Sequence, residues 1–302
     1  MLDHFVSCDW GSSSFRLSLV RSSNLSTVRE IKYKDLGFAQ IDWDTQEKMT
    51  FLTDKVKDLC SHTDKPWPCI VSGMGSSSIG IKELPYGKLP LTLQDPKLPV
   101  CQLDHNVFLI SGIASRDDVM RGEEVQAIGA ALTLDNAKDK TLLILPGTHS
   151  KHVYLNSECI VSFKTYMTGE LFSILGKHSI LRHSIEAKEV GLDSNAFENG
   201  VKDAKKILLS QLFTIRANQL LQGKSKQYGK SYLSGLLIGN ELSQVREMET
   251  QRVVLVAEEP LASRYKEAIA VVNANISVLG FPVKKATRNG QLHILKHILN
   301  ES

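Results

Sequence analysis

The sequence of 302 residues lacks a long apolar segment, since no run of hydrophobic residues approaches the roughly 18 residues of a membrane-spanning helix. Its beginning also lacks a basic segment that leads into an apolar stretch, so we expect no signal peptide. The net charge of +3 is too small to indicate binding to nucleic acid. These absences favour a cytoplasmic protein that binds neither membranes nor nucleic acid.

Cysteine is scarce, and its spacing is not that of a metal or redox site. The five cysteines, at positions 8, 60, 69, 101 and 159, are an odd number and contain no C-x-x-C pair. We expect reduced thiols that serve mostly as small core residues, as in cytosolic proteins. Nothing in their spacing predicts a zinc site.

The rest of the composition is that of an ordinary globular protein, with 42% hydrophobic and 23% charged residues. A chain of this length can bury roughly three quarters of its unfolded surface. The length therefore allows one large domain or two moderate ones.

Residues 5–20 are typical of a strand, a tight turn and a second strand. Gly11 can take the positive φ of a tight turn, and three serines follow it. Such a turn offers backbone N–H groups and hydroxyls to an oxyanion such as a phosphate. Asp9 stands just before the turn, where a carboxylate can hold Mg²⁺ through water. The alternative is an ordinary hairpin without a ligand.

Hydrophobic periodicity predicts alternating strands and helices in the first half. Asp44 and Glu47 form a capping-box pattern at the start of a helix that ends near Cys60. A second helix is expected to begin at Asp117 or Asp118 and to end near residue 134. The remaining expected segments are strands at 26–33, 68–72 and 107–110, a Gly- and Ser-rich loop at 73–80 and a long ordered loop or insertion at 84–99.

The second half follows a polar stretch at 135–140, which is the candidate domain boundary. It opens with strands and then becomes mainly helical. The expected strands are 141–145, 159–165, 253–256 and 276–279, and the expected helices are 169–178, 196–222, 230–249 and 290–299.

A short repeat links the two halves. Residues 11–19 align without a gap with residues 147–155: both contain Gly, a hydroxyl residue, Ser three positions after the Gly, and a final Leu. Two phosphate-binding turns at similar places favour two similar domains that face one another across a cleft. We expect these domains at 1–137 and 138–302, with a C-terminal helix of about 289–302 packing back on the first.

Five segments resemble the 2-dehydro-3-deoxygalactonokinase family, a sugar-acid kinase branch of the superfamily that also contains acetate kinase and actin. The matching segments are 9–16, 118–124, 146–153, 165–172 and 233–242. The resemblance implies an α/β fold of two ribonuclease H-like domains with mixed β-sheets flanked by helices, an actin-like ATPase fold with an interdomain cleft. It also implies ATP and Mg²⁺ as cofactors and phosphorylation of the 6-hydroxyl of 2-dehydro-3-deoxy-D-galactonate.

The resemblance also assigns the phosphate and metal sites. Asp9 is expected to serve the Mg²⁺ ion. Lys151 either adds charge at the second turn or points to solvent. The expected phosphate-binding residues are Gly11, Ser12, Ser13, Ser14, Gly147, Thr148, His149, Ser150 and Lys151.

Phosphoryl transfer needs a base for the attacking hydroxyl. Asp118 is the expected base and Asp117 the alternative, although either residue could be only a helix cap. Arg121 is expected to bind the substrate carboxylate, because an Arg fork matches that group. Glu123 either binds substrate hydroxyls or supports the helix, and Arg16 either binds substrate or phosphate or pairs within the first domain.

The loop at 73–81 is expected to line the sugar pocket through Gly75, Ser76 and Ser77. Here the sequence departs from its relatives, whose usual Arg and Trp are absent. The exact acceptor therefore stays open, and another 2-keto-3-deoxy acid or sugar is an alternative.

The adenosine side is expected at Gly235, Gly239 and Ala257. Two glycines in one helix cost roughly 1 kcal/mol each, so they need a reason. Close approach of a purine is one reason, and tight helix packing is the other.

The expected partner is a small sugar acid, and a homodimer is an open alternative to a monomer. A rival from another class is a nucleotide-binding sensor of the same superfamily without transfer activity. The presence of Asp9, Asp118 and both turns argues against that rival.

Overall fold

The computed structural model describes residues 2–61, 65–134, 141–156, 158–188, 191–247 and 252–300. The chain forms two compact units. Unit 1 consists of Met1–Lys138, Val153–Phe163 and Phe281–Ser302, and unit 2 of Asp139–His152 and Lys164–Gly280. The chain therefore passes between the units four times. The expected boundary at 135–140 lies outside the described residues.

The first part of the chain alternates strands with two helices. Its elements are β1 (His4–Trp10), β2 (Phe15–Arg21), β3 (Thr27–Tyr33), α1 (Thr45–Cys60), β4 (Cys69–Gly73), a 3₁₀ turn (Met74–Ser76), β5 (Gly87–Lys88), β6 (Leu91–Thr92), β7 (Val100–Asp104), β8 (Val107–Ile110), β9 (Ile113–Ala114), β10 (Val119–Met120) and α2 (Glu123–Ala131).

The second part begins with strands and becomes mainly helical. Its elements are β11 (Thr141–Leu145), β12 (Ser150–Leu155), β13 (Cys159–Tyr166), α3 (Thr168–His178), a 3₁₀ turn (Ile180–His183), α4 (Ser194–Asp203), α5 (Leu208–Gln222), α6 (Lys226–Glu241), a 3₁₀ segment (Leu242–Glu247), β14 (Arg252–Val256), α7 (Leu261–Val272), β15 (Ser277–Phe281) and α8 (Val283–Ile298).

The two large sheets share the order of their five main strands. The first sheet is β3-β2-β1-β4-β8-β7, and the other is β15-β14-β11-β12-β13-β6. In each, a meander of three sequential strands is extended beyond its first strand by two later strands, so the order third, second, first, fourth, fifth recurs. β1 pairs antiparallel with β2 and parallel with β4, which makes the sheet mixed. The predicted α/β class with mixed sheets and flanking helices is confirmed.

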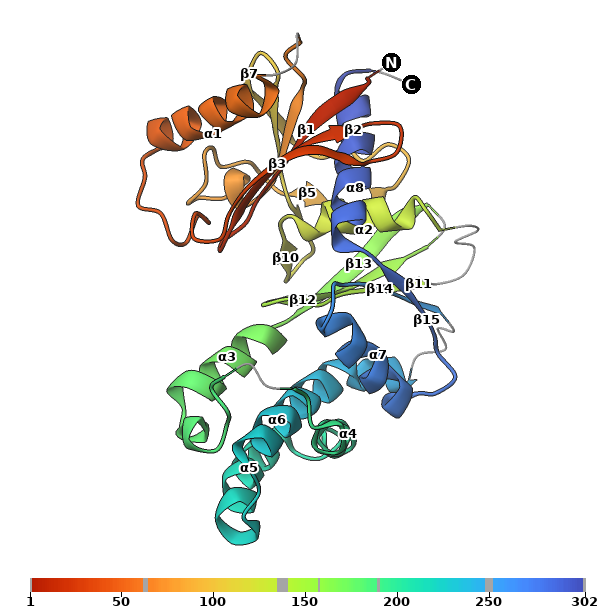
Figure 1. Ribbon diagram of the computed structural model, residues 1–302. Helices are drawn as coiled ribbons and strands as arrows, with labels where there is room; N and C mark the ends of the chain where they lie inside the picture. The colour runs from red at the N-terminus through yellow and green to blue at the C-terminus, as the bar shows by residue number, and fades with distance from the viewer. Residues whose placement is uncertain are drawn as a thin grey trace. The chain divides into compact units, whose positions relative to one another are not determined.

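Helices cover both faces of the first sheet, and they come from opposite ends of the sequence. α1 and α8 lie on opposite sides of strands β1 to β3 (Figure 1). On the α1 side, alternate residues Val6, Cys8 and Trp10 of β1 join a buried apolar core that includes Leu52. This alternation follows from the two-residue period of a strand. On the α8 side, the Gln291 amide nitrogen donates to the Cys8 carbonyl oxygen at 2.9 Å.

The start of α1 confirms the predicted capping box. The Glu47 amide donates to the Asp44 carboxylate and the Asp44 amide donates to the Glu47 carboxylate, both at 2.8 Å. The two bonds satisfy amides that have no partner within the helix.

The expected start of the second helix is wrong. α2 begins at Glu123 after Gly122, and the expected caps Asp117 and Asp118 lie before β10. Because Val119 and Met120 pair with β9, the chain is extended there and cannot yet be helical. The Asp118 carboxylate accepts from the Val119 amide at 2.8 Å instead of capping α2.

Three other expected boundaries also differ. The expected helix at 196–222 is two helices, because α4 ends in a turn in which the Lys206 amide donates to the Asp203 carbonyl at 2.9 Å. α6 starts and ends earlier than the expected 230–249. α8 begins at Val283, well before the expected residue 290.

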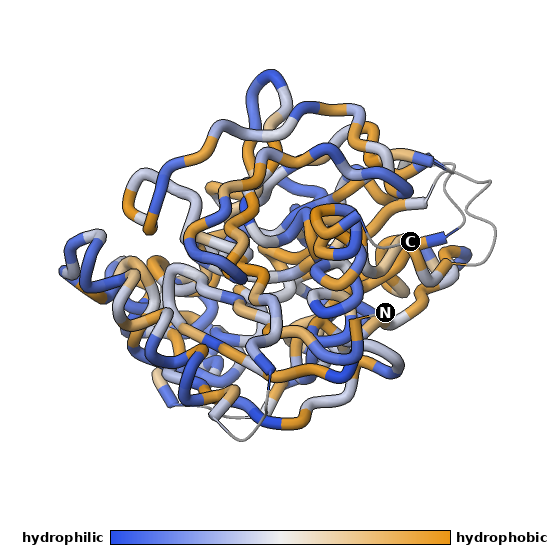
Figure 2. The backbone as a smooth tube through the Cα atoms, turned by 90° about the horizontal axis from the view of Figure 1, so that it is seen from above, coloured by the Kyte–Doolittle hydropathy of each residue, from blue (hydrophilic) through white to orange (hydrophobic). Residues whose placement is uncertain are grey.

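Hydrophobic and hydrophilic stretches are interspersed along the chain (Figure 2). No helix among the described residues is long and apolar enough to span a membrane.

Candidate functional site

The first repeated turn connects β1 and β2 in unit 1. Its Gly11 amide donates to the Ser14 carbonyl at 3.0 Å. The amides of Phe38 and Ala39 donate to the Gly11 and Ser12 carbonyl oxygens, each at 3.0 Å. These bonds direct the carbonyls of the turn into the protein, while Ser12 is exposed.

The expected positive φ at Gly11 is wrong. Among the described residues, the glycines with positive φ are Gly73, Gly122 and Gly223. The special glycine beside the turn is Gly37, because a Cβ there would lie 2.3 Å from the backbone of Ser12. Close packing of segment 36–39 on the turn therefore shapes it, rather than a left-handed residue within it.

Asp9 forms a charge cluster with one guanidinium and a second carboxylate. Asp9 and Arg16 are cross-strand partners, with 3.8 Å between the Arg16 Nη1 and Asp9 Oδ2 atoms. Burial raises the pKa of Asp9, the Arg16 charge lowers it, and the Glu123 charge raises it again. Glu123 therefore lies within electrostatic reach of Asp9, at the first position of α2.

Two glycines allow the ends of β1, β4 and the start of α2 to meet. A Cβ at Gly73 would lie 2.6 Å from the Trp10 carbonyl oxygen, and one at Gly122 would lie 3.3 Å from the Gly73 Cα atom. Both glycines have positive φ, 93° and 106°. The close contacts and the positive φ both favour glycine here, so the backbones of the three segments pack directly on one another.

The loop at 73–80 is tied to α2 through Arg121. Arg121 Nη1 donates to the carbonyl and to the hydroxyl oxygen of Ser76, each at 2.6 Å. Its guanidinium carbon lies 4.3 Å from the centre of the Tyr86 ring. The structure thus brings together Ser76 and Arg121, two expected substrate residues, although Ser76 is fully buried.

The other expected loop residues have internal roles. The Gly75 carbonyl accepts from the Ile81 amide at 2.7 Å, and the Ser77 hydroxyl donates to the Met74 carbonyl at 2.7 Å.

Asp117 and Asp118 belong to a separate turn. The Ser115 amide donates to the Asp118 carbonyl at 2.9 Å, and the Ser115 hydroxyl donates to the Asp117 carboxylate at 3.4 Å. The carboxylate at the start of the helix is Glu123, which the sequence placed among substrate-binding or supporting residues.

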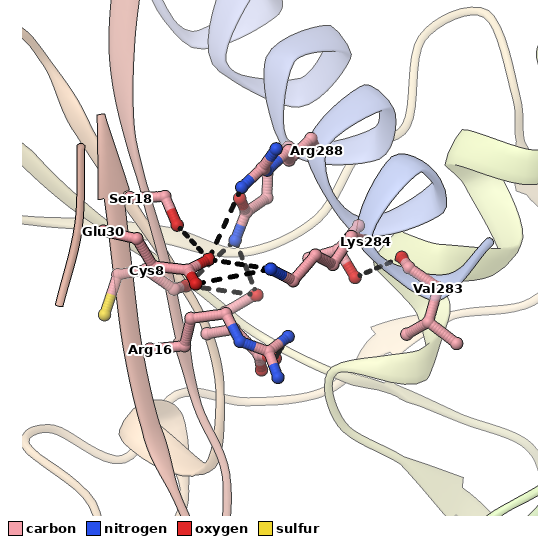
Figure 3. A network of polar contacts seen from close by, with 11 residues as sticks. Cys8, Arg16, Ser18, Glu30, Val283, Lys284 and Arg288 are labelled. Atoms are coloured by element: carbon pink, nitrogen blue, oxygen red, sulfur yellow. Dashed lines mark hydrogen bonds and ion pairs between the residues drawn. The ribbon is translucent and has the colours of Figure 1, made fainter. Parts of the chain in front are cut away.

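Arg16 also belongs to a polar network between the first sheet and α8 (Figure 3). Glu30 accepts from the Ser18 hydroxyl and from Lys284 Nζ, each at 3.1 Å, and Arg288 Nη2 lies 3.6 Å away. Burial raises the pKa of Glu30, but the hydrogen bond and charge of Lys284, the hydrogen bond of Ser18 and the charge of Arg16 outweigh it and lower that pKa overall. Arg16 contributes its charge to both Asp9 and Glu30, so its expected pairing role has a structural basis.

The second repeated turn lies between β11 and β12 in unit 2. Gly147, Thr148 and His149 are exposed, and His149 Nε2 lies 2.5 Å from a Glu170 carboxylate oxygen. Lys151 is only 3% exposed, and its ammonium donates to the His149 carbonyl at 2.9 Å. The alternative in which Lys151 points to solvent is therefore wrong.

Ser150 faces away from solvent. Its hydroxyl is buried, accepts from the Gly147 amide at 3.3 Å and lies 2.9 Å from the Tyr265 hydroxyl. In this structure the hydroxyl supports the turn from inside the protein, and the expected phosphate contact through it stays a prediction.

A pocket of ≈ 310 Å³ opens beside this turn, entirely within unit 2. Its floor is mainly apolar, with one guanidinium. The lining residues are Gly147, Thr148, Thr168, Gly169, Phe172, Ser234, Leu237, Ile238, Leu261, Arg264 and Tyr265.

The side of α6 that carries the expected adenosine glycines faces α4 rather than this pocket. A Cβ at Gly235 would lie 2.0 Å from the Phe197 carbonyl oxygen, and one at Gly239 would lie 2.9 Å from the Val201 backbone. Both atoms belong to α4, so helix packing accounts for the two glycines. α6, the helix that carries both glycines, lines the pocket through Ser234, Leu237 and Ile238. Ala257, the third expected residue, is half-buried directly after β14.

The sequence did not single out Glu241, a buried polar residue behind the second turn. Glu241 and His152 are 2% and 0% exposed, and His152 Nε2 lies 3.0 Å from Glu241 Oε1. The signal in the sequence was Glu241 itself, a charged residue that ends the apolar run of α6.

Comparison with known proteins decides the family. The family model of 2-keto-3-deoxy-galactonokinase matches residues 9–294. The chain belongs to the 2-keto-3-deoxy-galactonokinase family. The match includes the end of β1, both turns and all but the end of α8.

Individual relatives match this chain over most of their length. The chain is 31% identical over 287 residues to a probable 2-dehydro-3-deoxygalactonokinase of Rhizobium meliloti, covering 90% of this chain and 91% of the relative. It is 29% identical to the 2-dehydro-3-deoxygalactonokinase of Escherichia coli, covering 92% of this chain and 94% of the relative. A crystal structure from Sinorhizobium meliloti, provisionally named 2-dehydro-3-deoxygalactonokinase, superposes with a TM-score of 0.85 at 30% identity over 97% of this chain and 99% of that one.

Proposed function

We propose that this protein is an ATP-dependent sugar-acid kinase that phosphorylates the 6-hydroxyl of 2-dehydro-3-deoxy-D-galactonate, giving the 6-phosphate and ADP. The observation that carries the proposal is the family match over residues 9–294. Two exposed Gly- and hydroxyl-containing turns, each between the first two strands of a meander, support it.

The unit 2 pocket fits a nucleotide. Leu237 and Ile238 offer apolar surface to a purine, and Arg264 offers a guanidinium. Gly147 and Thr148 present exposed backbone to phosphate oxygens at the pocket rim. In this proposal ATP binds there.

Asp9 fits a role on Mg²⁺ that accompanies the nucleotide. Its pKa is raised by burial and by the nearby Glu123 carboxylate, and a divalent cation relieves both effects. The described residues contain no group of three or more metal-ligating side chains, so phosphate and water would complete the coordination. When bound, the ion would neutralise charge on the transferred phosphoryl group.

In unit 1 we propose Glu123 as the base that accepts the proton of the attacking hydroxyl. It is the carboxylate at the start of α2 and in the field of Asp9. Asp118 and Asp117 remain the alternatives proposed from the sequence. Arg121, held over Tyr86 and against Ser76, is proposed to bind the substrate carboxylate.

ADP release with a panel of 2-keto-3-deoxy acids and common sugars tests the reaction. We expect turnover to be highest with 2-dehydro-3-deoxy-D-galactonate. Glu123→Gln should lose at least about 10² in kcat while it keeps ATP binding. Asp118→Asn and Asp117→Asn serve as the comparison variants, and a selective loss in either one would transfer the base to that residue. Binding of ATP without turnover of any acceptor would instead support the sensor alternative.

A second acceptor remains a specific alternative. Loop 73–81 lacks the Arg and Trp usual in relatives, and its Ser76 is bound by Arg121. If another 2-keto-3-deoxy acid gives the highest kcat/KM, the reaction class stands and the acceptor changes.

A further inference from the structure

Glu241, the last residue of α6, is the centre of a buried hydrogen-bond network in unit 2. Its Oε1 atom accepts from His152 Nε2 at 3.0 Å. Its Oε2 atom accepts from the Tyr265 hydroxyl at 2.7 Å and from the Thr168 hydroxyl. Because three donors from three other elements converge on one carboxylate, the residue connects β12, α3 and α7.

One branch of the network leads to the second turn with a fixed direction. A carboxylate only accepts hydrogen bonds, so the Tyr265 hydroxyl donates its hydrogen bond to Glu241. Burial and the Glu241 charge raise the pKa of Tyr265 far above its usual value, which keeps that proton in place. The Tyr265 oxygen then accepts from the Ser150 hydroxyl at 2.9 Å, and the Ser150 oxygen accepts from the Gly147 amide at 3.3 Å.

The other branch leads to the start of α3 through Thr168. The next residue, Gly169, packs on the turn so closely that a Cβ would lie 2.4 Å from the Gly147 carbonyl oxygen. The Glu170 amide donates to the Thr148 carbonyl at 3.0 Å. The turn and the start of α3 are thus held against one another, and Glu241 is linked to both of them.

Both branches end at the wall of the pocket. Gly147, Thr148, Thr168, Gly169 and Tyr265 all line it. We propose that Glu241 is a positioning residue that, through Tyr265 and Ser150 on one side and Thr168 on the other, sets the backbone of the Gly147–Thr148 rim for nucleotide phosphate. This inference rests on the proposed binding of ATP in unit 2.

A purely structural role predicts a different outcome from a positioning role. A buried carboxylate that only stabilises the fold affects the free energy of unfolding and the active fraction. A carboxylate that sets the rim also changes the affinity of the folded protein for MgATP. Tyr232 provides a matched control, because its buried hydroxyl donates to the Asp203 carboxylate at 2.8 Å elsewhere in unit 2.

The test compares Tyr265→Phe, Ser150→Ala and Glu241→Gln with Tyr232→Phe in the full chain. The readouts are the Kd of MgATP by calorimetry without acceptor, the KM of the acceptor, and thermal stability. We expect Tyr265→Phe and Ser150→Ala each to weaken MgATP binding about tenfold, the size of one lost hydrogen bond. Acceptor KM should stay near that of the wild type, and Ser150→Thr, which keeps the hydroxyl, should recover most of the affinity.

Equal MgATP affinity of folded Tyr265→Phe, Ser150→Ala and wild-type protein would overturn the inference, as would a similar loss in Tyr232→Phe. Absence of MgATP binding by the wild type would overturn it together with the nucleotide site. A wild type that binds MgATP but phosphorylates no acceptor contradicts only the kinase reaction, because the affinity ratios still decide the role of Glu241. If Glu241→Gln does not fold, the Tyr265 and Ser150 variants decide alone.

Discussion

At the scale of single residues, Glu124 is a buried acid whose pKa depends on its surroundings. It is 1% exposed, its Oε2 atom accepts from the Gly122 amide at 2.6 Å, and its Oε1 atom has no hydrogen-bond partner among the described residues. Burial, followed by the Glu123 charge, raises the pKa of Glu124 to about 8. The folded protein therefore binds this proton at neutral pH, whereas the unfolded chain releases it.

The pH dependence of stability follows from that difference. Between 4.5, the ordinary pKa of a glutamate, and about 8, the folded state holds more protons than the unfolded state, so stability falls as pH rises. The stability that protonated Glu124 contributes is fully present below pH 4.5 and is lost as the pH rises to about 8. The loss is at most about 1.4 kcal/mol per pH unit. Glu124→Gln, which stays neutral, should flatten the pH dependence of the unfolding free energy, measured in urea, between about pH 5 and pH 8. Exposed Glu83→Gln is the control, and parallel pH profiles of Glu124→Gln and wild type would contradict the prediction.

Local sequence patterns indicate exposed turn residues more readily than buried polar residues. The turn residues Gly147 and Thr148 belong to a local pattern that neighbouring residues of the sequence define. The roles of Glu241 and Glu124 depend on burial and on partners far away in the sequence, as Glu241 with His152 shows. Single-sequence patterns contain no such information.

At the scale of elements, the sequence predicted those whose ends have local signals. The capping box at Asp44 and Glu47 marked the start of α1. The start of α2 was wrong because Asp117 and Asp118 have the same residue type as a cap, while pairing of β10 with β9 makes that segment extended. Strand pairing is a tertiary effect and overrides local preference.

Helix packing at Gly235 gives a prediction for the α4–α6 pair. Gly235→Ala places a methyl 2.0 Å from the Phe197 carbonyl oxygen, so the helices must separate. We expect a loss of about 1–3 kcal/mol in the free energy of unfolding, measured by urea denaturation. The affinity of the folded variant for MgATP should change little, because Gly235 faces α4 rather than the pocket.

Gly176→Ala in α3 is the matched control. Its Cβ would meet only an Ile185 methyl at 3.9 Å, an ordinary contact, so the better helix propensity of Ala should give a gain of up to about 1 kcal/mol. A large loss of MgATP affinity in Gly235→Ala without a loss of stability would return Gly235 to the adenosine site.

At the scale of the whole molecule, the short repeated turn predicted a similarity between the two halves of the chain. The shared strand order of the two large sheets gives the turns at 11–14 and 147–150 the same place in each meander. What the repeat could not indicate is the path of the chain, which changes unit four times. That path depends on which surfaces pack, as in the contact of α2 with α8, where a Cβ at Gly290 would lie 2.0 Å from the Val125 carbonyl oxygen.

The last helix is therefore expected to be essential for unit 1, although most of unit 2 separates it from β13 along the chain. A chain truncated after residue 281 lacks α8, whose Gln291 donates to the Cys8 carbonyl and to the Ser72 hydroxyl, each at 2.9 Å. It also exposes the apolar face of α2, which packs along α8. We expect loss of cooperative unfolding in unit 1.

Tryptophan fluorescence can measure this loss selectively, because the three tryptophans, at positions 10, 43 and 67, all lie in unit 1. In the truncated chain, emission without denaturant should shift to the red, since Trp10 loses its buried surroundings. The control Lys296→Ala changes only the exposed side of α8 and should keep the wild-type spectrum and transition. A truncated chain with wild-type emission and an unchanged urea midpoint would show that unit 1 folds without α8.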